Sequence, residues 1–216
     1  MKATQLGSIL LLLFLYSCSF ENEFNTGEVK NGVYSNDFFN IEFTLPNGWS
    51  SGTRDEVNLF LESSAESMSK LDDSLAAVID TNDFSEAILF IMTKHPEIKE
   101  GENRSVGIPS SLILSSEMVQ KNSQLSTSED YLVNLKKEYQ AINQIKMRFD
   151  EDYTDVAIGS KNFKVLKGRA SLGFIELNQE YWCVIEKGYA LVVILTYANP
   201  FDRIEMYKAL KNMHST

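Results

Sequence analysis

The clearest pattern of apolar and polar positions lies near the carboxyl end of the chain. Residues 179–186 and 189–197 are two β-forming runs, and Lys187-Gly188 joins them. The second run, Tyr189 to Tyr197, is almost continuously apolar, which is typical of a strand covered on both faces. Gly188 can take the positive φ that a tight two-residue turn requires. The pattern therefore predicts a β-hairpin within an antiparallel sheet.

Further strands are predicted on both sides of this hairpin in the sequence. Residues 39–45 alternate between apolar and polar side chains, which is the period of a half-buried strand. Pro46-Asn47-Gly48 ends that strand with turn chemistry, and we expect Trp49 to cover the edge of the core. Short apolar or β-forming runs predict other strands at residues 87–92, 111–119 and 153–158, and from Phe163 to Leu166.

Helices are predicted where capping residues precede an apolar stripe. Capping-box spacing occurs at Thr53 and Glu56 and again at Ser126 and Glu129, and a further helical segment covers residues 70–79. The helix after Ser126 should end near Ile145. Its expected buried positions are Leu132, Leu135, Tyr139 and Ile142.

A last helix is predicted to close the chain. Asn199 is suited to the N-cap, Pro200 to the first helical position and Asp202 to the first turn. Apolar residues then recur at three-residue spacing, and we expect them to cover the sheet. They are Phe201, Ile204, Tyr207 and Leu210.

The amino terminus predicts export and a lipid anchor. Residues 6–15 form an apolar run of about ten residues, interrupted only by Gly7 and Ser8, which is too short to span a bilayer. The run ends in Leu15-Tyr16-Ser17-Cys18, which resembles the bacterial lipoprotein signal. That resemblance implies removal of residues 1–17 and lipid on Cys18. An ordinary signal peptide or a short uncleaved anchor is the alternative.

Lipid on Cys18 would leave Cys183 as a single thiol. The chain has two cysteines, so no disulfide could then form. Cys183 lies in the predicted hairpin strand, where a cysteine most often serves as a small buried hydrophobe. No histidine stands in a partner motif for a cysteine nucleophile. We therefore predict no catalytic role for Cys183.

Composition restricts the classes of function. Hydrophobic residues make up 44% of the chain, which fits a folded domain, and the formal net charge of −10 argues against binding nucleic acid. The chain has no glycine loop for phosphate and no nucleophile elbow. His95 and His214, the two histidines, are too far apart in the sequence to suggest a zinc or copper site. No catalytic residue, cofactor or metal site is predicted.

Two residue sets leave other functions open. Carboxylates cluster at Asp72-Asp73 and at residues 150–155, where they could support acid–base chemistry or bind a cation, although solvated turns are the simpler interpretation. Several aromatic residues could line a pocket, although core packing is the simpler role. These are Phe38, Phe39, Trp49, Tyr181, Trp182 and Tyr189.

The order of several short motifs resembles the PsbP-like (Mog1/PsbP) family over roughly residues 31–216. The motifs are residues 34–39, 43–49, 158–163, 179–182 and 188–191, with 195–197. The resemblance implies an α/β (α+β) fold in which an antiparallel β-sheet is sandwiched between helices. It also raises the expectation of a docking or accessory module, because the family is not characteristically enzymatic.

We therefore expect three regions: a signal peptide at 1–17, a flexible tether at 18–30 and a single domain at 31–216. The expected function is that of a non-catalytic binding module, held extracytoplasmically on a membrane by lipid, with an unknown protein partner. A carboxylate-based hydrolase and a carrier of an apolar ligand are the alternatives.

Overall fold

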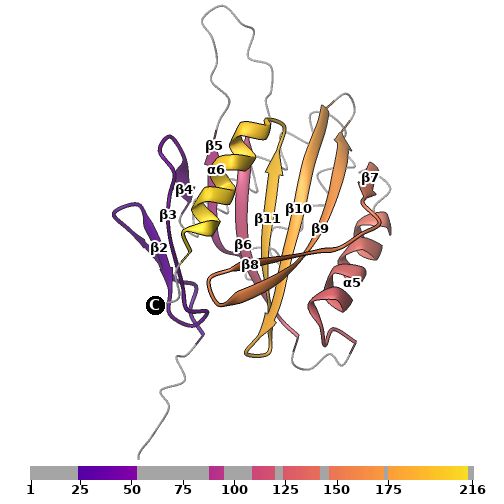
Figure 1. Ribbon diagram of the computed structural model, residues 1–216, viewed down its shortest axis with the longest axis horizontal. Helices are drawn as coiled ribbons and strands as arrows, with labels where there is room; N and C mark the ends of the chain where they lie inside the picture. Colours follow the sequence, from indigo (N-terminus) through magenta and orange to yellow (C-terminus); the bar gives the residue numbers. More distant parts are fainter. Residues whose placement is uncertain are drawn as a thin grey trace, which may run out of the picture.

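The described residues form mostly antiparallel β-structure together with helices, which confirms the predicted mixture of α and β elements. A computed structural model describes residues 24–52, 88–94, 109–119, 124–141, 146–172 and 175–213. Within these ranges the chain forms an eight-stranded sheet, a separate three-stranded sheet, and the helices α5 and α6 (Figure 1). None of the described helices has the length and apolar character needed to cross a membrane.

The predicted hairpin is confirmed as strands β10 (Ile175–Glu186) and β11 (Tyr189–Tyr197). They pair antiparallel from Asn178 opposite Tyr197 to Glu186 opposite Tyr189. Lys187 and Gly188 have φ angles of 51° and 82°. Positive φ at both central residues is the geometry that matches the right-handed twist of the two strands.

The large sheet extends from this hairpin in both directions. Its strand order is β4-β5-β6-β11-β10-β9-β7, and β8 pairs with β9. Strand β11 lies inside the sheet, and its residues are buried or half-buried throughout. The other strands are β4 (Ser50–Gly52), β5 (Ile88–Lys94), β6 (Ser110–Met118), β7 (Lys146–Phe149), β8 (Thr154–Ile158) and β9 (Lys161–Leu172).

The amino-terminal residues form a second sheet, which the sequence analysis did not anticipate. It consists of β1 (Glu28–Lys30), β2 (Val33–Asn36) and β3 (Ile41–Thr44). In β3, Ile41 and Phe43 are buried, as the alternating pattern predicts. The predicted tether at 18–30 extends too far along the chain, because Glu28–Lys30 pairs with β2 and therefore belongs to the fold.

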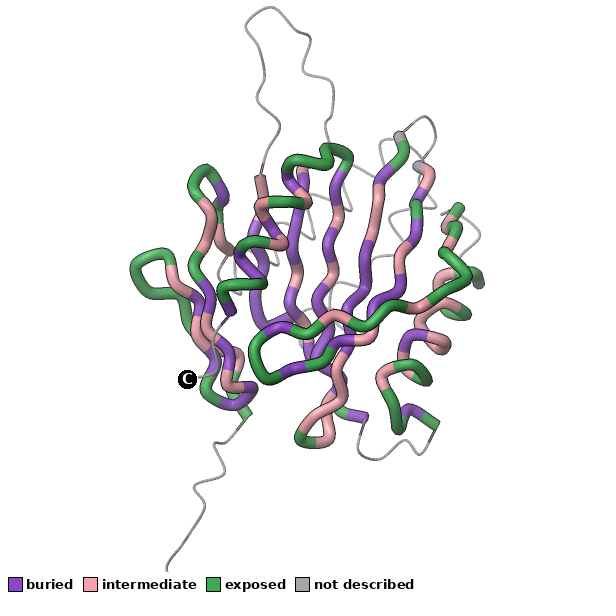
Figure 2. Tube along the Cα trace, in the orientation of Figure 1, coloured by how far each residue is buried: buried purple, intermediate pink, exposed green. Residues whose placement is uncertain are grey.

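Adjacent residues of β10 show that the large sheet has two apolar faces. Trp182 packs in a cluster that contains the α6 residues Met206 and Leu210. Its neighbours Tyr181 and Cys183 pack in another cluster, which contains Leu132 of α5. Successive side chains of a strand point to opposite faces, so α5 and α6 contact opposite faces of the sheet. Figure 2 shows the buried residues concentrated along its middle strands.

Helix α5 (Ser128–Ala141) begins one residue later than predicted. The capping box joins Thr127 and Asp130, not Ser126 and Glu129: Asp130 N donates to Thr127 Oγ1 and Thr127 N donates to Asp130 Oδ2, both at 3.1 Å. An aspartate can close the same reciprocal arrangement as a glutamate, which the sequence pattern overlooked. Leu132 is fully buried, as predicted.

Two predicted helices cannot be compared with the structure. The one beginning at Thr53 and the one at residues 70–79 lie outside the described residues. Complete helical layers on both sides of the sheet therefore stay a prediction. Strand β7, by contrast, is a described element that the sequence analysis did not predict.

Candidate functional site on helix α6

Helix α6 (Pro200–Lys211) begins where the capping residues predict. The Asn199 side chain accepts a hydrogen bond from Phe201 N at 3.0 Å, and Pro200 occupies the first turn. Asp202 lies in the first turn and Lys208 and Lys211 in the last, so their charges complement the helix dipole. The local sequence therefore sets the start and the polarity of this helix.

The face that α6 turns toward the sheet differs from the predicted one. Of the four predicted residues only Leu210 is buried; Tyr207 is half-buried, and Phe201 and Ile204 are 74% and 47% exposed. The buried residues of the helix are Asp202, Met206, Ala209 and Leu210. The three-residue apolar spacing was misleading because an acidic residue, Asp202, occupies the inner face.

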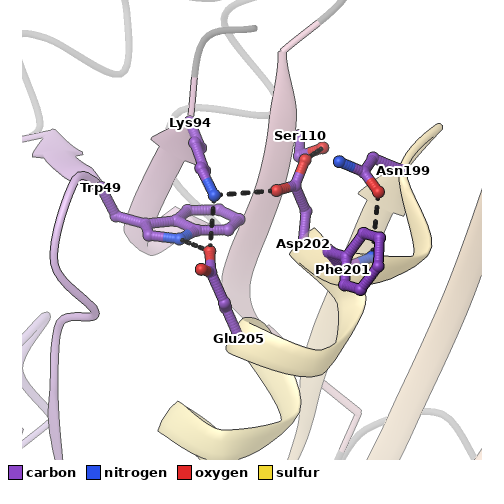
Figure 3. Close-up of polar contacts among 7 residues, drawn as sticks. All are labelled: Trp49, Lys94, Ser110, Asn199, Phe201, Asp202 and Glu205. Atoms are coloured by element: carbon purple, nitrogen blue, oxygen red, sulfur yellow. Dashed lines mark hydrogen bonds and ion pairs between the residues drawn. The ribbon is translucent and has the colours of Figure 1, made fainter. Parts of the chain in front are cut away.

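A cluster at the rim of the sheet explains why Asp202 faces inward. We call it the Lys94 cluster, and it contains Trp49, Lys94, Ser110, Asp202 and Glu205 (Figure 3). Lys94 Nζ lies 3.0 Å from Asp202 Oδ1 and 2.7 Å from Glu205 Oε2. Ser110 Oγ donates to Asp202 Oδ2 at 2.7 Å, and Trp49 Nε1 donates to Glu205 Oε2 at 2.8 Å. Strands β5 and β6 and the residue before β4 thus converge on one turn of α6.

The Lys94 cluster is electrostatically stable in its charged form. Hydrogen bonds to Glu205 and then to Asp202 raise the pKa of Lys94 above its ordinary value. Hydrogen bonds from Lys94 and Trp49 lower the pKa of Glu205. A lysine that stays protonated is no nucleophile, and a glutamate that stays ionised is no general acid. The arrangement fixes the helix to the sheet.

A second cluster holds the middle of α6 at greater depth. We call it the Glu180 cluster, and it contains Glu180, Trp182, Tyr197, Arg203 and Tyr207. Glu180 Oε1 accepts from Arg203 Nε at 2.5 Å and from the Tyr197 hydroxyl at 2.9 Å. Its Oε2 accepts from the Tyr207 hydroxyl at 2.5 Å and from Trp182 Nε1 at 3.1 Å. The Glu180 side chain is only 1% exposed, so these four donors replace its water.

The four donors also decide the ionisation of Glu180. Burial alone would raise its pKa, but the hydrogen bonds from Tyr207, Arg203 and Tyr197 outweigh burial and lower it. Burial together with the charge of Glu180 raises the pKa values of Tyr197 and Tyr207, which therefore stay protonated as donors. Both carboxylate oxygens are occupied by protein donors.

Within the described part of the chain, the outward side of α6 has no comparable polar partners. Phe201, Ile204, Lys208 and Lys211 are all exposed, and we call them the outer α6 face. Their spacing of three, four and three residues places them in one stripe along a helix of 3.6 residues per turn. The stripe is apolar toward the start of the helix and basic toward its end. It therefore differs from the acidic chain as a whole, whose formal net charge is −10.

The structure places the residues that the sequence singled out as follows. Cys18, Asp72-Asp73, His95 and His214 lie outside the described residues. Cys183 is fully buried, and burial raises its pKa to about 12, as expected for a structural thiol. Residues 150–152 and Asp155 are exposed. Among the described residues, no group of three His, Cys, Asp or Glu side chains could hold a metal ion.

The aromatic residues that could line a pocket pack against one another or the core. Phe38 and Phe39 have ring centroids 4.8 Å apart, and Trp182 lies 4.8 Å from Tyr207. A cavity of about 340 Å³ lies beside β1 and β2, lined by polar or small residues. They are Asn25, Thr26, Gly27, Glu28, Ser35 and Asp37. This lining does not suit an apolar ligand.

Three of the charged residues that join α6 to the sheet were not predicted from the sequence: Glu180, Lys94 and Arg203. Glu180 lies two residues from Trp182, so it occupies the same face of β10 as a fully buried tryptophan. A charged residue at a core position of a strand is the signal that could have identified it. Lys94 and Arg203 carry no comparable local signal.

The chain is similar to known proteins in fold and not in sequence. No family model matches the sequence, and no curated protein matches it. Among solved structures, the fold is similar to the solution structure of cyanobacterial PsbP (CyanoP) from Synechocystis sp. PCC 6803, with 12% identity, a TM-score of 0.49, and coverage of 90% of this chain and 99% of that chain.

The fold is also similar to LpqN, which is involved in cell envelope biogenesis of Mycobacterium tuberculosis. That match has 11% identity and a TM-score of 0.41 and covers 81% of this chain and 82% of the other. A PsbP protein, from the family that the sequence motifs resemble, is thus among the structures to which this chain is similar.

Proposed function

We propose that this protein is a lipid-anchored, extracytoplasmic accessory module that binds a protein partner through the outer α6 face. The observation that carries the proposal is the exposure of Phe201 and Ile204 on a helix whose opposite side is fixed to the sheet by two polar clusters. A rigid helix that presents two large apolar side chains to water is suited to docking.

The proposed anchor is the lipid on Cys18, after removal of residues 1–17. The short apolar run and Leu15-Tyr16-Ser17-Cys18 support it. Cys18 precedes Phe24, the first described residue, by six residues. The Phe24 ring stacks on Tyr189 at a centroid distance of 5.0 Å, so the chain enters the fold beside the β10–β11 turn.

This entry point supports a protein as the partner of α6. Strand β11 runs from the turn toward the start of α6 (Figure 1). Nine residues of antiparallel strand span about 27 Å at about 3.4 Å per residue step. Phe201 would therefore lie most of the length of the sheet away from the anchored end, in reach of an extracytoplasmic protein.

The chemistry of the outer α6 face defines the partner surface. Phe201 and Ile204 require an apolar depression, and Lys208 and Lys211 require carboxylates at its border. The partner is thus a protein with an apolar patch edged by Asp or Glu. We also propose that further helices complete the layers on both sides of the sheet.

Two of the described carboxylates, Glu180 and Glu205, do not suit the role of a general acid. Glu180 and Glu205 are held ionised by donors, and a general acid must keep a proton near its working pH. The hydrolase and the apolar carrier gain no specific support from the described residues.

Site-specific photo-crosslinking in the native envelope tests the proposal. A photoreactive amino acid at position 201 should give a discrete adduct with one protein, and the adduct should disappear on adding Ile204→Glu. The matched control position is the exposed residue Glu151. The same adduct from position 151, or none from 201, would overturn the docking role.

The anchor is tested separately by Cys18→Ser. We expect this variant to be released from membranes into the soluble extracytoplasmic fraction. Membrane association that persists in the variant would contradict the lipid anchor.

A further inference from the structure

The end of the molecule around the β10–β11 turn also exposes apolar side chains. Phe24 is 42% exposed although one side of its ring stacks on Tyr189 with an interplanar angle of 13°. Met118 is 53% exposed and lies directly opposite Tyr189 in the pairing of β6 with β11. Opposite residues of an antiparallel pair share a face of the sheet, so Met118 lies beside Tyr189, and the Phe24 ring stacks on the same tyrosine.

A lysine completes this surface. Lys187, in the turn itself, donates a hydrogen bond from Nζ to the Phe38 carbonyl and lies 4.9 Å from the centre of the Phe38 ring. We call Phe24, Met118, Lys187 and Tyr189 the turn-end patch. Exposed phenylalanine and methionine, with tyrosine and lysine beside them, are the side chains that suit the boundary between acyl chains and headgroups.

The length of chain before Phe24 determines what can reach this patch. Phe24 follows Cys18 by six residue steps, and six steps span at most about 20 Å when the chain is fully extended. A lipid held on Cys18 would therefore keep the turn-end patch within about 20 Å of the bilayer surface at all times. The patch would therefore meet this bilayer more often than any other apolar surface.

We infer that the turn-end patch inserts Phe24 and Met118 into the bilayer that holds the lipid of Cys18. The inference rests on the proposed lipid anchor and adds a second contact to it. Two weak membrane signals together give a stable attachment where one is marginal. The second contact also orients the protein, because it holds the β10–β11 turn against the membrane and directs the start of α6 away from it.

Fluorescence labelling of the full-length, lipidated protein tests this surface. Met118→Cys would carry an environment-sensitive fluorophore, and the matched control is Ile204→Cys on the outer α6 face, which has similar exposure. Cys183 should stay unlabelled because it is fully buried and its pKa is raised to about 12. The labelled proteins are reconstituted in vesicles of phosphatidylethanolamine and phosphatidylglycerol that contain a spin-labelled quencher lipid.

We expect a blue shift and quenching at position 118 and neither at position 204, with both signals at 118 reduced by Phe24→Ser. Equal responses at the two positions, or none at 118, in protein that floats with the vesicles would overturn the inference alone. A response at 118 that depends on the protein-to-lipid ratio would assign the patch to a second copy and also overturn it. Protein that fails to float would overturn the anchor and, with it, this inference.

Discussion

The two polar clusters that fix α6 to the sheet differ in depth and in chemistry. Glu180 is 1% exposed and accepts four hydrogen bonds, three of them from neutral groups. In the other cluster Lys94 bridges two carboxylates, Asp202 and Glu205, which are 12% and 37% exposed. A buried charge depends on every partner, whereas a charge at the rim can recover water. We therefore expect the Glu180 cluster to contribute more to the free energy of unfolding than the Lys94 cluster, which holds the first turns of α6 in place.

The largest expected effect is that of Arg203→Met. Glu180 would stay buried without its cation, so the free energy of unfolding should fall by about 2–4 kcal/mol. Urea denaturation followed by the fluorescence of the two buried tryptophans, Trp49 and Trp182, measures this loss. The control is Arg148→Met, whose ion pair with Glu176 is exposed on both sides and should contribute about 0.5 kcal/mol or less. Equal losses of stability in the two variants would show that burial of Glu180 does not strengthen its dependence on the cation.

Lys94→Met should have a smaller effect, a loss of about 1–2 kcal/mol in the free energy of unfolding. Asp202 and Glu205 would lose the cation between them but keep their bonds to Ser110 and Trp49. Adding Glu205→Gln should restore part of the loss, because one of two neighbouring negative charges disappears. A double variant as unstable as the sum of both single variants would argue against this coupling.

Acid should weaken both clusters. The folded pKa values of Glu180 and Glu205 lie below the ordinary value of 4.5, so their stabilisation is present above pH 4.5 and is lost as the pH falls through the folded values. Each such group changes the free energy of unfolding by at most about 1.4 kcal/mol per pH unit. In urea titrations at several pH values, Glu180→Gln should show a shallower acid slope than the unaltered protein. An unchanged slope would mean that Glu180 does not titrate differently in the folded protein.

Salt should produce the smallest effect. Raising the ionic strength from about 0.1 M to about 1 M shortens the screening length from about 10 Å to about 3 Å. The stability difference between Lys94→Met and the unaltered protein should then shrink by a few tenths of a kcal/mol. The difference caused by Arg203→Met should shrink less, because Glu180 is only 1% exposed although Arg203 itself is 32% exposed. An equal salt response in both would place the two clusters in the same environment.

Features determined by neighbouring residues were predictable from the sequence. The Lys187-Gly188 hairpin follows from the turn residues and the two β-forming runs beside them. The start of α6 follows from Asn199 and Pro200, because a capping side chain bonds to a backbone amide only two residues away. Even the error of one residue at the start of α5 is local, since Thr127 and Asp130 form the same kind of box as the predicted pair.

Features determined by distant residues were not predictable. The inward face of α6 depends on Lys94, which is 111 residues away from Glu205 in the sequence. Without that partner, Asp202 is expected in water and Phe201 in the core, which is the reverse of what the structure shows. The same reason hid the candidate site: Phe201 and Ile204 were assigned to the core, so no surface was predicted on α6.

The buried thiol of Cys183 gives this molecule a built-in reporter of its own opening. Its side chain belongs to the apolar cluster between α5 and the sheet and is fully buried there. A thiol reagent can therefore reach it only when α5 moves away from the sheet. The rate of alkylation at Cys183 therefore reports how often the α5 face of the sheet opens. Helix α6 and its charged clusters lie on the opposite face. Comparing that rate between unaltered protein and Arg203→Met would tell whether the two sides of the sheet open together or independently.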